Sequence, residues 1–193
     1  MRSVCVYCSS SNAVDAAYFD AARELGKRIA ARGDTLIYGG TDIGLMGAVA
    51  RAVHAGGGRV VGVIPRAFQA LSMPHDMADE IIFTQDLRER KATMEARADA
   101  FIALPGGFGT LEEVLEILTL RQIQVHTKPI ILLNIQDFYT PLVTLFEGLY
   151  HKRFAKPVRA LYYIAPDVAD AFTYLDSYIP PSVPGKWFEP EGQ

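Results

Sequence analysis

Short runs of apolar, largely β-branched residues alternate along the chain with longer stretches in which apolar residues recur every three or four positions. The short runs predict buried strands and the longer stretches predict helices, with glycine at many of the joins. The predicted strands cover residues 4–7, 36–38, 60–64, 81–83, 100–104, 130–133 and 162–164. The predicted helices run from a cap at Asp15 to Gly33 and over residues 45–55, 86–98, 110–124, 141–150 and 167–178, while 66–79 is expected to be a loop.

Strands that are apolar on both faces and separated by helices are typical of a parallel sheet covered on both sides. We therefore expect an α/β fold, a Rossmann-like doubly wound parallel sheet with helices on both faces. The length of 193 residues favours one domain, which we expect to span residues 1–179. Residues 180–193 contain Pro180, Pro181, Pro184 and Pro190 and are expected to form an irregular tail.

Composition narrows the class of protein. The chain has 19 basic and 22 acidic residues, a net charge of −3, which excludes a globally basic nucleic-acid binder. No run approaches the roughly 18–20 apolar residues of a membrane span, and residues 8–12 are too polar for a signal peptide. We therefore expect a cytoplasmic protein without nucleic-acid or membrane partners.

Two cysteines, Cys5 and Cys8, form a C-x-x-C sequence within a predicted strand. Residues three apart on a strand point to opposite faces, so we expect two reduced structural cysteines rather than a redox pair. The four histidines, at positions 54, 75, 126 and 151, show no metal-ligand spacing. The sequence thus predicts no metal site.

Glycine-rich or polar turns follow three of the predicted strands, at residues 8–12, 39–44 and 105–109. Parallel sheets bind ligands at the carboxyl ends of their strands, so these turns predict one nucleotide-like site, although βα turns commonly use Gly, Ser and Asn anyway. None of the turns matches the dinucleotide fingerprint G-x-G-x-x-G, and no Gly-Lys-Ser/Thr triplet occurs. The turns therefore suit a single phosphate.

The segment 105–113, P-G-G-F-G-T-L-E-E, carries the most chemistry. Its glycines let backbone N–H groups approach an anion, the start of the following helix adds partial positive charge, and Thr110 can donate a hydroxyl. Glu113, one helical turn further on, would then lie near the sugar of a bound nucleotide. The alternative is that Glu112 and Glu113 only complement the helix dipole on a solvated face.

This segment and the Arg90-Lys91 pair on the preceding predicted helix resemble the signature of the LONELY GUY (LOG) family. Its members are phosphoribohydrolases that release cytokinin bases from their 5′-monophosphates, under an older label of lysine-decarboxylase-like. The resemblance covers residues 2 to about 135 and includes Cys8-Ser9-Ser10, Tyr38-Gly39-Gly40, Gly44-Leu45-Met46-Gly47 and Gly62-Val63-Ile64-Pro65. The chain departs from the family pattern at Thr41-Asp42, at Leu87-Arg88-Glu89 and around Leu71–Met73, where a base-pocket glutamate has no clear match.

The resemblance implies a hydrolase that cleaves the N-glycosidic bond of a purine nucleoside 5′-monophosphate, either AMP or an N6-modified AMP, without a cofactor. It implies a homodimer, with Arg90 and Glu113 as the catalytic residues. The substrate-binding residues that it implies are Ser9, Ser10, Gly39, Gly40, Met46, Arg90, Lys91, Gly106, Gly107, Phe108, Gly109, Thr110, Glu112, Glu113 and Thr119. Without the motif, Arg90 and Lys91 would be interpreted as part of a solvated charge run.

Two other functions compete with this interpretation. A decarboxylase would need pyridoxal phosphate on a lysine, and no lysine falls at an obvious core position. A non-catalytic carrier of a nucleotide-like cofactor would use the same fold. Such a carrier has no need of a carboxylate beside the sugar, so Glu113 together with Arg90 favours the hydrolase.

Overall fold

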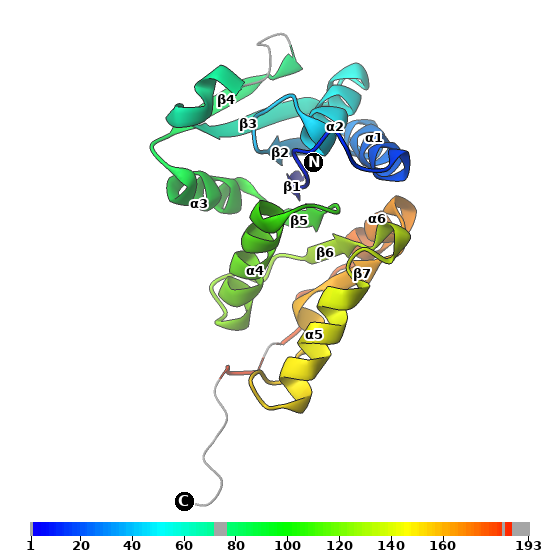
Figure 1. Ribbon diagram of the computed structural model, residues 1–193, viewed down its shortest axis with the longest axis vertical. Helices are drawn as coiled ribbons and strands as arrows, with labels where there is room; N and C mark the ends of the chain where they lie inside the picture. The colour runs from blue at the N-terminus through cyan, green and yellow to red at the C-terminus, as the bar shows by residue number, and fades with distance from the viewer. Residues whose placement is uncertain (1, 72–76, 183, 187–193) are drawn as a thin grey trace, which may run out of the picture.

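A computed structural model describes residues 2–71, 77–182 and 184–186. Over these residues the chain forms one seven-stranded sheet with helices on both faces (Figure 1). The strands are β1 (Ser3–Tyr7), β2 (Thr35–Tyr38), β3 (Arg59–Pro65), β4 (Glu80–Thr84), β5 (Ala100–Ala103), β6 (Ile130–Leu133) and β7 (Tyr163–Ala165). The helices are α1 (Ala16–Ala31), α2 (Gly44–Ala55), α3 (Leu87–Arg97), α4 (Phe108–Gln122), α5 (Thr140–His151) and α6 (Val168–Ser177), with short 3-10 turns η1 (Arg66–Leu71), η3 (Ile135–Asp137) and η4 (Arg159–Leu161).

Every strand pairs in parallel with its neighbours, in the order β4-β3-β2-β1-β5-β6-β7. From β1 the chain adds β2, β3 and β4 on one side, and it then crosses back to place β5 on the other side of β1. Val4 of β1 pairs with Leu36 of β2 and with Ala100 of β5. The direction of winding therefore reverses between β1 and β5, the place where open α/β sheets bind ligands. The predicted fold class is confirmed.

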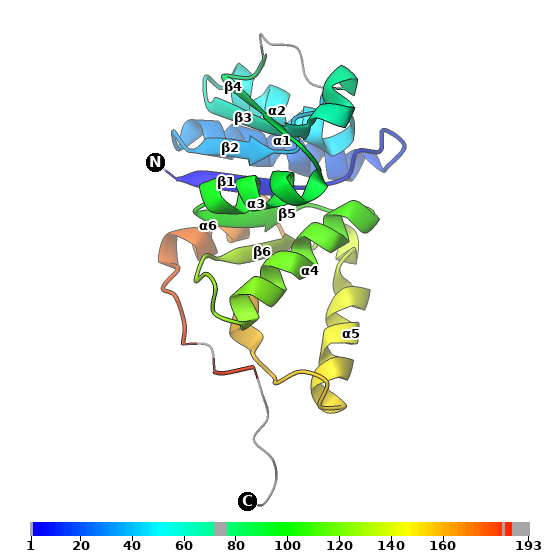
Figure 2. The same ribbon diagram turned by 90° about the vertical axis from the view of Figure 1, so that its left-hand side faces the viewer.

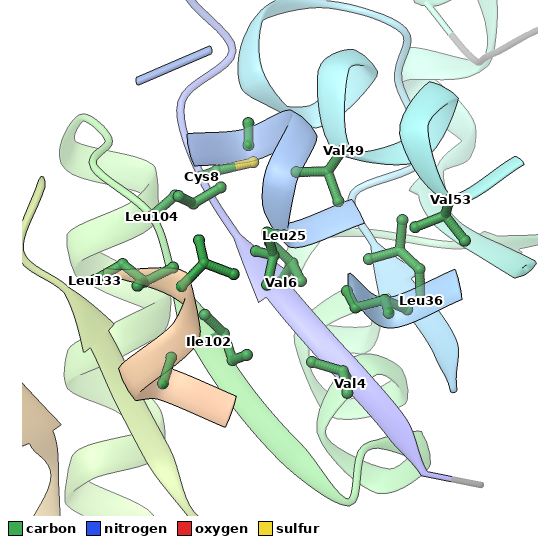
Figure 3. Close-up of a cluster of buried hydrophobic side chains, with 14 of the residues drawn as sticks. Val4, Val6, Cys8, Leu25, Leu36, Val49, Val53, Ile102, Leu104 and Leu133 are labelled. Atoms are coloured by element: carbon green, nitrogen blue, oxygen red, sulfur yellow. The ribbon is translucent and has the colours of Figure 1, made fainter. Parts of the chain in front are cut away.

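The strands separate two hydrophobic cores, because successive side chains point to opposite faces of a sheet. Val4, Val6, Leu36 and Ile102 lie in the first core with apolar residues of α1, α2 and α6, as Figure 3 shows in close-up. The second core lies under α3, α4 and α5, and in Figure 2 α3 and α4 lie in front of the sheet. The helices on this second side carry Arg90 and Glu113.

Cys5 and Cys8 lie in different cores, and both are buried and free. Burial raises the pKa of both thiols far above the usual value, so they remain protonated at neutral pH. Inert thiols on opposite faces of the sheet match the expected structural role.

Local sequence explains where the helices begin. Asp15 caps α1 by accepting a hydrogen bond from the N–H of Ala17 at 2.9 Å, and Asp86 caps α3 by accepting from the N–H groups of Arg88 and Glu89. Helix α4 begins at Phe108, two residues earlier than predicted, because Gly107 already takes the N-cap position. For the seven strands and six α-helices the predicted ends therefore differ from the observed ones by one or two residues at most, whereas the short 3-10 turns were not predicted.

The expectation of a loop over 66–79 is wrong for its first part, since Arg66–Leu71 forms the turn η1. The six residues R-A-F-Q-A-L, with polar residues at 66 and 69, are too few to establish a helical period, and a 3-10 turn this short needs none. The chain departs from the family pattern around Leu71–Met73, and residues 72 and 73 of this stretch lie outside the described residues. His75 also lies outside them.

The described residues beyond 179, namely 180–182 and 184–186, form neither helix nor strand, as the prolines predict. The boundary of the domain at residue 179 stays a prediction. No helix in the described part of the chain is long and apolar enough to cross a membrane.

Candidate active site

A cleft of about 580 Å³ opens over the carboxyl ends of β1, β2, β3 and β5, where the winding of the sheet reverses. Ten of the predicted site residues line it: Ser9, Ser10, Gly39, Met46, Arg90, Gly107, Phe108, Gly109, Thr110 and Glu113. They come from three turns and three helices that are far apart in sequence. The predicted coincidence of the strand-end turns at one site is therefore observed.

The turn after β1 ties the other two turns together. The N–H of Ser9 donates to the carbonyl of Pro105 at 3.2 Å, and the carbonyl of Ser9 accepts from the N–H of Leu45 at 2.9 Å. Asn12 accepts a further hydrogen bond from the N–H of Gly44 at 3.0 Å. A polar turn without glycine thus fixes the spacing between the starts of α2 and α4.

One end of the cleft is built to receive an anion. Gly107 is the N-cap of α4 and, within the described structure, no side chain caps this helix, while its first residues Phe108, Gly109 and Thr110 line the cleft. The hydroxyl-bearing side chain of Thr110 is buried beneath the turn. A Cβ atom at Gly106 would lie 2.1 Å from Oγ1 of Thr110, so only glycine lets the turn fold this closely onto the helix. Phe108 lines the cleft as well, and it is 93 % exposed.

Arg90 of α3 and Glu113 of α4 meet at the centre of the cleft. Nη1 of Arg90 donates to Oε1 of Glu113 at 2.6 Å, and the two side chains are only 12 % and 10 % exposed. Nε of Arg90 donates to the carbonyl of Val63 at 3.1 Å, which fixes the plane of the guanidinium. The alternative of a solvated, dipole-complementing Glu113 is therefore wrong, and so is that of a solvated Arg90.

Two opposing influences act on the Glu113 carboxyl. Burial raises its pKa above the usual value, while the adjacent Arg90 guanidinium lowers it and so opposes the effect of burial. The net direction is upward. A carboxylate held with little solvent beside a fixed cation is suited to stabilise positive charge and to accept a proton from water.

Gly39 makes room for the arginine. A Cβ atom at this position would lie 2.4 Å from Nη2 of Arg90 and 2.8 Å from Sδ of Met46. Gly40 has a φ of +78° and packs against Val63 and Ile64, and it does not line the cleft within the described residues. These two glycines shape the site, and Gly39 does so by having no side chain.

Four other predicted site residues lie elsewhere. Lys91 pairs with Glu112 and, at 2.6 Å, with Glu116, on the outer side of α3 and α4. Thr119 donates to the carbonyl of Leu115 at 2.8 Å and lines a separate hollow between α4 and α5. Gly106 lines a hollow on the other side of the turn from the cleft. Lys91, Gly106, Glu112 and Thr119 are thus absent from the described residues that line the cleft.

The sequence analysis missed an apolar part of the cleft lining. Ile64 and Pro65 close it from the end of β3, while Phe68 and Leu87 stand at its rim with 42 % and 53 % exposure. Such a wall suits a flat, largely apolar ring. The one available signal was the pair of large apolar residues in segments that were otherwise polar, at the start of α3 and in the expected loop.

The described residues offer few ligands for a metal ion or for pyridoxal phosphate. Over residues 2–71, 77–182 and 184–186, no three His, Cys, Asp or Glu side chains are grouped as a metal site would need. No lysine is found among the described residues that line the cleft, so the cleft offers no amine to pyridoxal phosphate. Among the described residues that line the cleft, the charged side chains are those of Arg90 and Glu113, and hydroxyl groups come from Tyr7, Ser9, Ser10, Ser11, Thr41 and Thr110.

A parallel α/β sheet with a glycine-rich turn at a helix start and a buried carboxylate–guanidinium pair at its switch point is typical of nucleotide-binding α/β proteins. A family model described as "Possible lysine decarboxylase" matches residues 46–175. The chain is 44 % identical over 180 residues to the cytokinin riboside 5′-monophosphate phosphoribohydrolase LOG of Oryza sativa subsp. japonica, covering 93 % of this chain and 74 % of the relative. It is 42 % identical, again over 93 % of its length and over 90 % of the relative, to a probable enzyme of the same name, LOG6, from Arabidopsis thaliana. The chain belongs to this LOG family.

Solved structures share the fold at lower identity. The molybdenum cofactor binding protein of Rippkaea orientalis superposes with a TM-score of 0.73 at 23 % identity, over 91 % of this chain and 96 % of that one. The molybdenum cofactor carrier protein of Chlamydomonas reinhardtii gives a TM-score of 0.70 at 25 % identity, over 91 % and 95 %. These likenesses concern the fold, and the site decides the function.

Proposed function

We propose that this protein is a phosphoribohydrolase that cleaves the N-glycosidic bond of a purine nucleoside 5′-monophosphate, releasing the free base and ribose 5-phosphate. Relatives with 42–44 % identity over 93 % of the chain carry the name of this activity. The observation that carries the proposal is the buried contact between Arg90 and Glu113 in a cleft with an anion-binding end.

The two ends of the cleft orient the substrate. The 5′-phosphate binds at the start of α4, where N–H groups and the helix dipole favour an anion. The base lies against Met46, Ile64 and Phe68, and its substituent at N6, if it has one, points toward that apolar end. The ribose then spans the middle of the cleft, with its C1′ atom over the Arg90–Glu113 pair.

Hydrolysis adds the hydroxyl group of water to C1′ as the bond from C1′ to the base nitrogen breaks, and the released base gains one proton in exchange for the one that the water loses. Positive charge develops on the ribose in the transition state, as in glycoside hydrolysis. The Glu113 carboxylate stabilises this charge and accepts a proton from the attacking water. Arg90 holds that carboxylate in place, and its planar guanidinium, which stays charged, presents further donors to the nucleotide.

The first prediction concerns the phosphate. The purified protein is expected to release the base from AMP or from N6-isopentenyl-AMP at least 100-fold more efficiently, in kcat/KM, than from the corresponding nucleosides. The anion end of the cleft has no ligand in a nucleoside, so that binding energy is lost. The measurement is chromatography of the free base, with GMP as a test of base selectivity.

Equal turnover of adenosine and AMP would contradict the phosphate-binding role of the α4 turn. Tight binding of AMP without any release of base would instead favour a non-catalytic carrier of a nucleotide-like ligand. Comparison of AMP with N6-isopentenyl-AMP also decides between plain adenine and an N6-modified base.

We propose further that two copies of the chain associate through α4 and α5. Leu115 and Ile123 of α4 are 43 % and 47 % exposed, and an apolar hollow of about 140 Å³ lies between the two helices. Thr119 lies in the same hollow. A second copy would cover these side chains, which a monomer leaves in water.

Light scattering is expected to give a mass near twice the 21.2 kDa of the chain at micromolar concentration. Leu115→Arg and Ile123→Arg should shift the protein toward the single-chain mass, because each places a charge in the proposed interface. Leu87→Arg, at an exposed position on α3, is the control for a surface arginine as such. A parent that stays at 21.2 kDa would refute the association.

The two cysteines are free and buried, as in proteins of a reducing compartment. This supports a cytoplasmic location, which we include in the proposal.

A further inference from the structure

Helix α3 carries Arg90 but has almost no apolar surface with which to pack. Of its eleven residues, L-R-E-R-K-A-T-M-E-A-R, only Met94 is buried. Helices of globular proteins are normally positioned by an apolar stripe about 100° wide. The placement of α3, and therefore of the arginine, must depend largely on polar contacts.

Those contacts include two consecutive residues of α3 that reach α4. Arg90 pairs with Glu113 inside the cleft, and Lys91 pairs with Glu112 and Glu116 outside it. The Lys91 side chain is 13 % exposed, whereas its carboxylate partners are 60 % and 43 % exposed. The ammonium group is thus held between the helices, and the carboxylates close over it from the solvent side.

The ammonium group remains charged in this position. Burial by itself lowers the pKa of Lys91, but the hydrogen bonds from its ammonium to Glu112 and Glu116 raise it, and the net direction is upward. Two carboxylates offset the loss of hydration, which an isolated buried ammonium could not tolerate. The contact is therefore a stable ionic link between α3 and α4.

We propose that Lys91, with Glu112 and Glu116, is a positioning residue: it fastens α3 to α4 so that Arg90 meets Glu113, and it does not bind substrate. This inference rests on the proposed function. It differs from the role that the sequence resemblance implies for Lys91 and Glu112, and it gives Glu116 a role that the motif does not contain. In the described structure none of the three lines the cleft.

The competing explanation is that the Lys91 ammonium binds the substrate phosphate directly. Removing a phosphate ligand raises KM, whereas misplacing Arg90 relative to Glu113 lowers kcat. The carboxylates give a second distinction. If they only compete with phosphate for the ammonium, then removing them improves binding, and if they complete the link, then removing them is as harmful as removing Lys91.

The experiment compares Lys91→Met, the double variant Glu112→Gln/Glu116→Gln and the triple variant that combines them. Lys91→Met and the double variant are each expected to lower kcat roughly ten- to hundredfold with KM unchanged within twofold, since small misplacements of catalytic groups have effects of this size. The triple variant should be no worse than Lys91→Met, because all three changes break one link. Lys91→Arg, which keeps the charge, should restore kcat to within a few-fold.

Arg97→Met is the matched control on the same helix. Arg97 pairs with Glu80 at 2.8 Å, at the end of α3 remote from the cleft, and its removal is expected to leave kcat unchanged. An equal loss of kcat in Arg97→Met would show that any weakening of α3 suffices, and would overturn the role assigned to Lys91. A rise in KM with an intact kcat in Lys91→Met would also overturn it.

Hydrogen exchange gives a readout that needs no activity. Amides of 87–97 should exchange faster in Lys91→Met than in the parent, while those of the sheet stay protected. Unchanged exchange in α3 refutes the link. If the parent hydrolyses no nucleoside monophosphate, the proposed function fails, and the exchange result alone decides whether Lys91 fastens α3.

Discussion

Glu113→Gln is expected to lower kcat about 10²- to 10⁴-fold, the range that general acid–base groups supply, or roughly 3–5 kcal/mol of barrier. Glutamine keeps the shape of the side chain and can still accept a hydrogen bond from Arg90. It loses the negative charge that stabilises the ribose and the basicity that activates water. The measurement is the steady-state release of base from the monophosphate.

Binding of the monophosphate should survive this substitution. In the proposed complex the phosphate binds at the start of α4 and not at a carboxylate, so calorimetry with AMP is expected to give a Kd within a few-fold of the parent. Loss of a nearby negative charge should if anything favour the anion. Glu24→Gln, the same chemical change at an exposed position of α1, is the control. Should Glu113→Gln keep parental turnover, Glu113 has no catalytic role and the carrier becomes the better hypothesis.

Arg90→Met is expected to lower kcat by about 10³-fold or more, because it removes a ligand of the nucleotide and leaves Glu113 buried without its cation. Arg90→Lys keeps the charge but lacks the rigid fork that contacts both Val63 and Glu113. We expect this conservative variant to recover at most a small part of the activity. Full activity in Arg90→Lys would show that only the charge matters.

Arg90→Met is also expected to shift the pH dependence of kcat in a defined direction. Glu113 acts as a carboxylate, so activity falls on the acid side as this group is protonated, and burial places that fall above the pKa of an ordinary glutamate. Arg90 lowers the pKa of Glu113, so Arg90→Met should move the acid limb of kcat to still higher pH. A profile of residual activity from pH 4 to 9 tests this. An acid limb that stays in place would mean that another group titrates.

Much of the fold followed from hydrophobic patterning. Runs such as Val60–Ile64 have no polar residue, as expected of a strand that is covered on both faces of the sheet. The helices predicted between these runs indicate that neighbouring strands are parallel. The anion-binding turn followed from glycine and helix-start chemistry at 105–110. The motif singled out Arg90 and Glu113, which patterning alone left on solvated helix faces.

Which of the predicted site residues line the cleft depends on the direction in which each side chain points, and the sequence does not reveal that direction. Consecutive helical residues point about 100° apart, so Arg90 enters the cleft while Lys91 leaves it, and Glu113 and Glu112 diverge in the same way. Thr119, six positions beyond Glu113, points roughly 240° around the helix and lies between α4 and α5. Phe68 and Leu87 meet at the rim of the cleft only because η1 and the start of α3 converge there.

The absence of a side chain at Gly39 limits which substitutions this enzyme can tolerate. The guanidinium of Arg90 and the sulfur of Met46 both lie within 3.0 Å of the position that a Cβ atom would take, so even alanine at position 39 requires both side chains to shift. The position of Arg90 on α3 thereby restricts which residues can stand at position 39, fifty-one positions earlier in the sequence at the end of β2. Libraries aimed at new base specificity should therefore hold Gly39 fixed and vary Phe68 and Leu87 instead, which line the cleft at positions that already carry a large side chain.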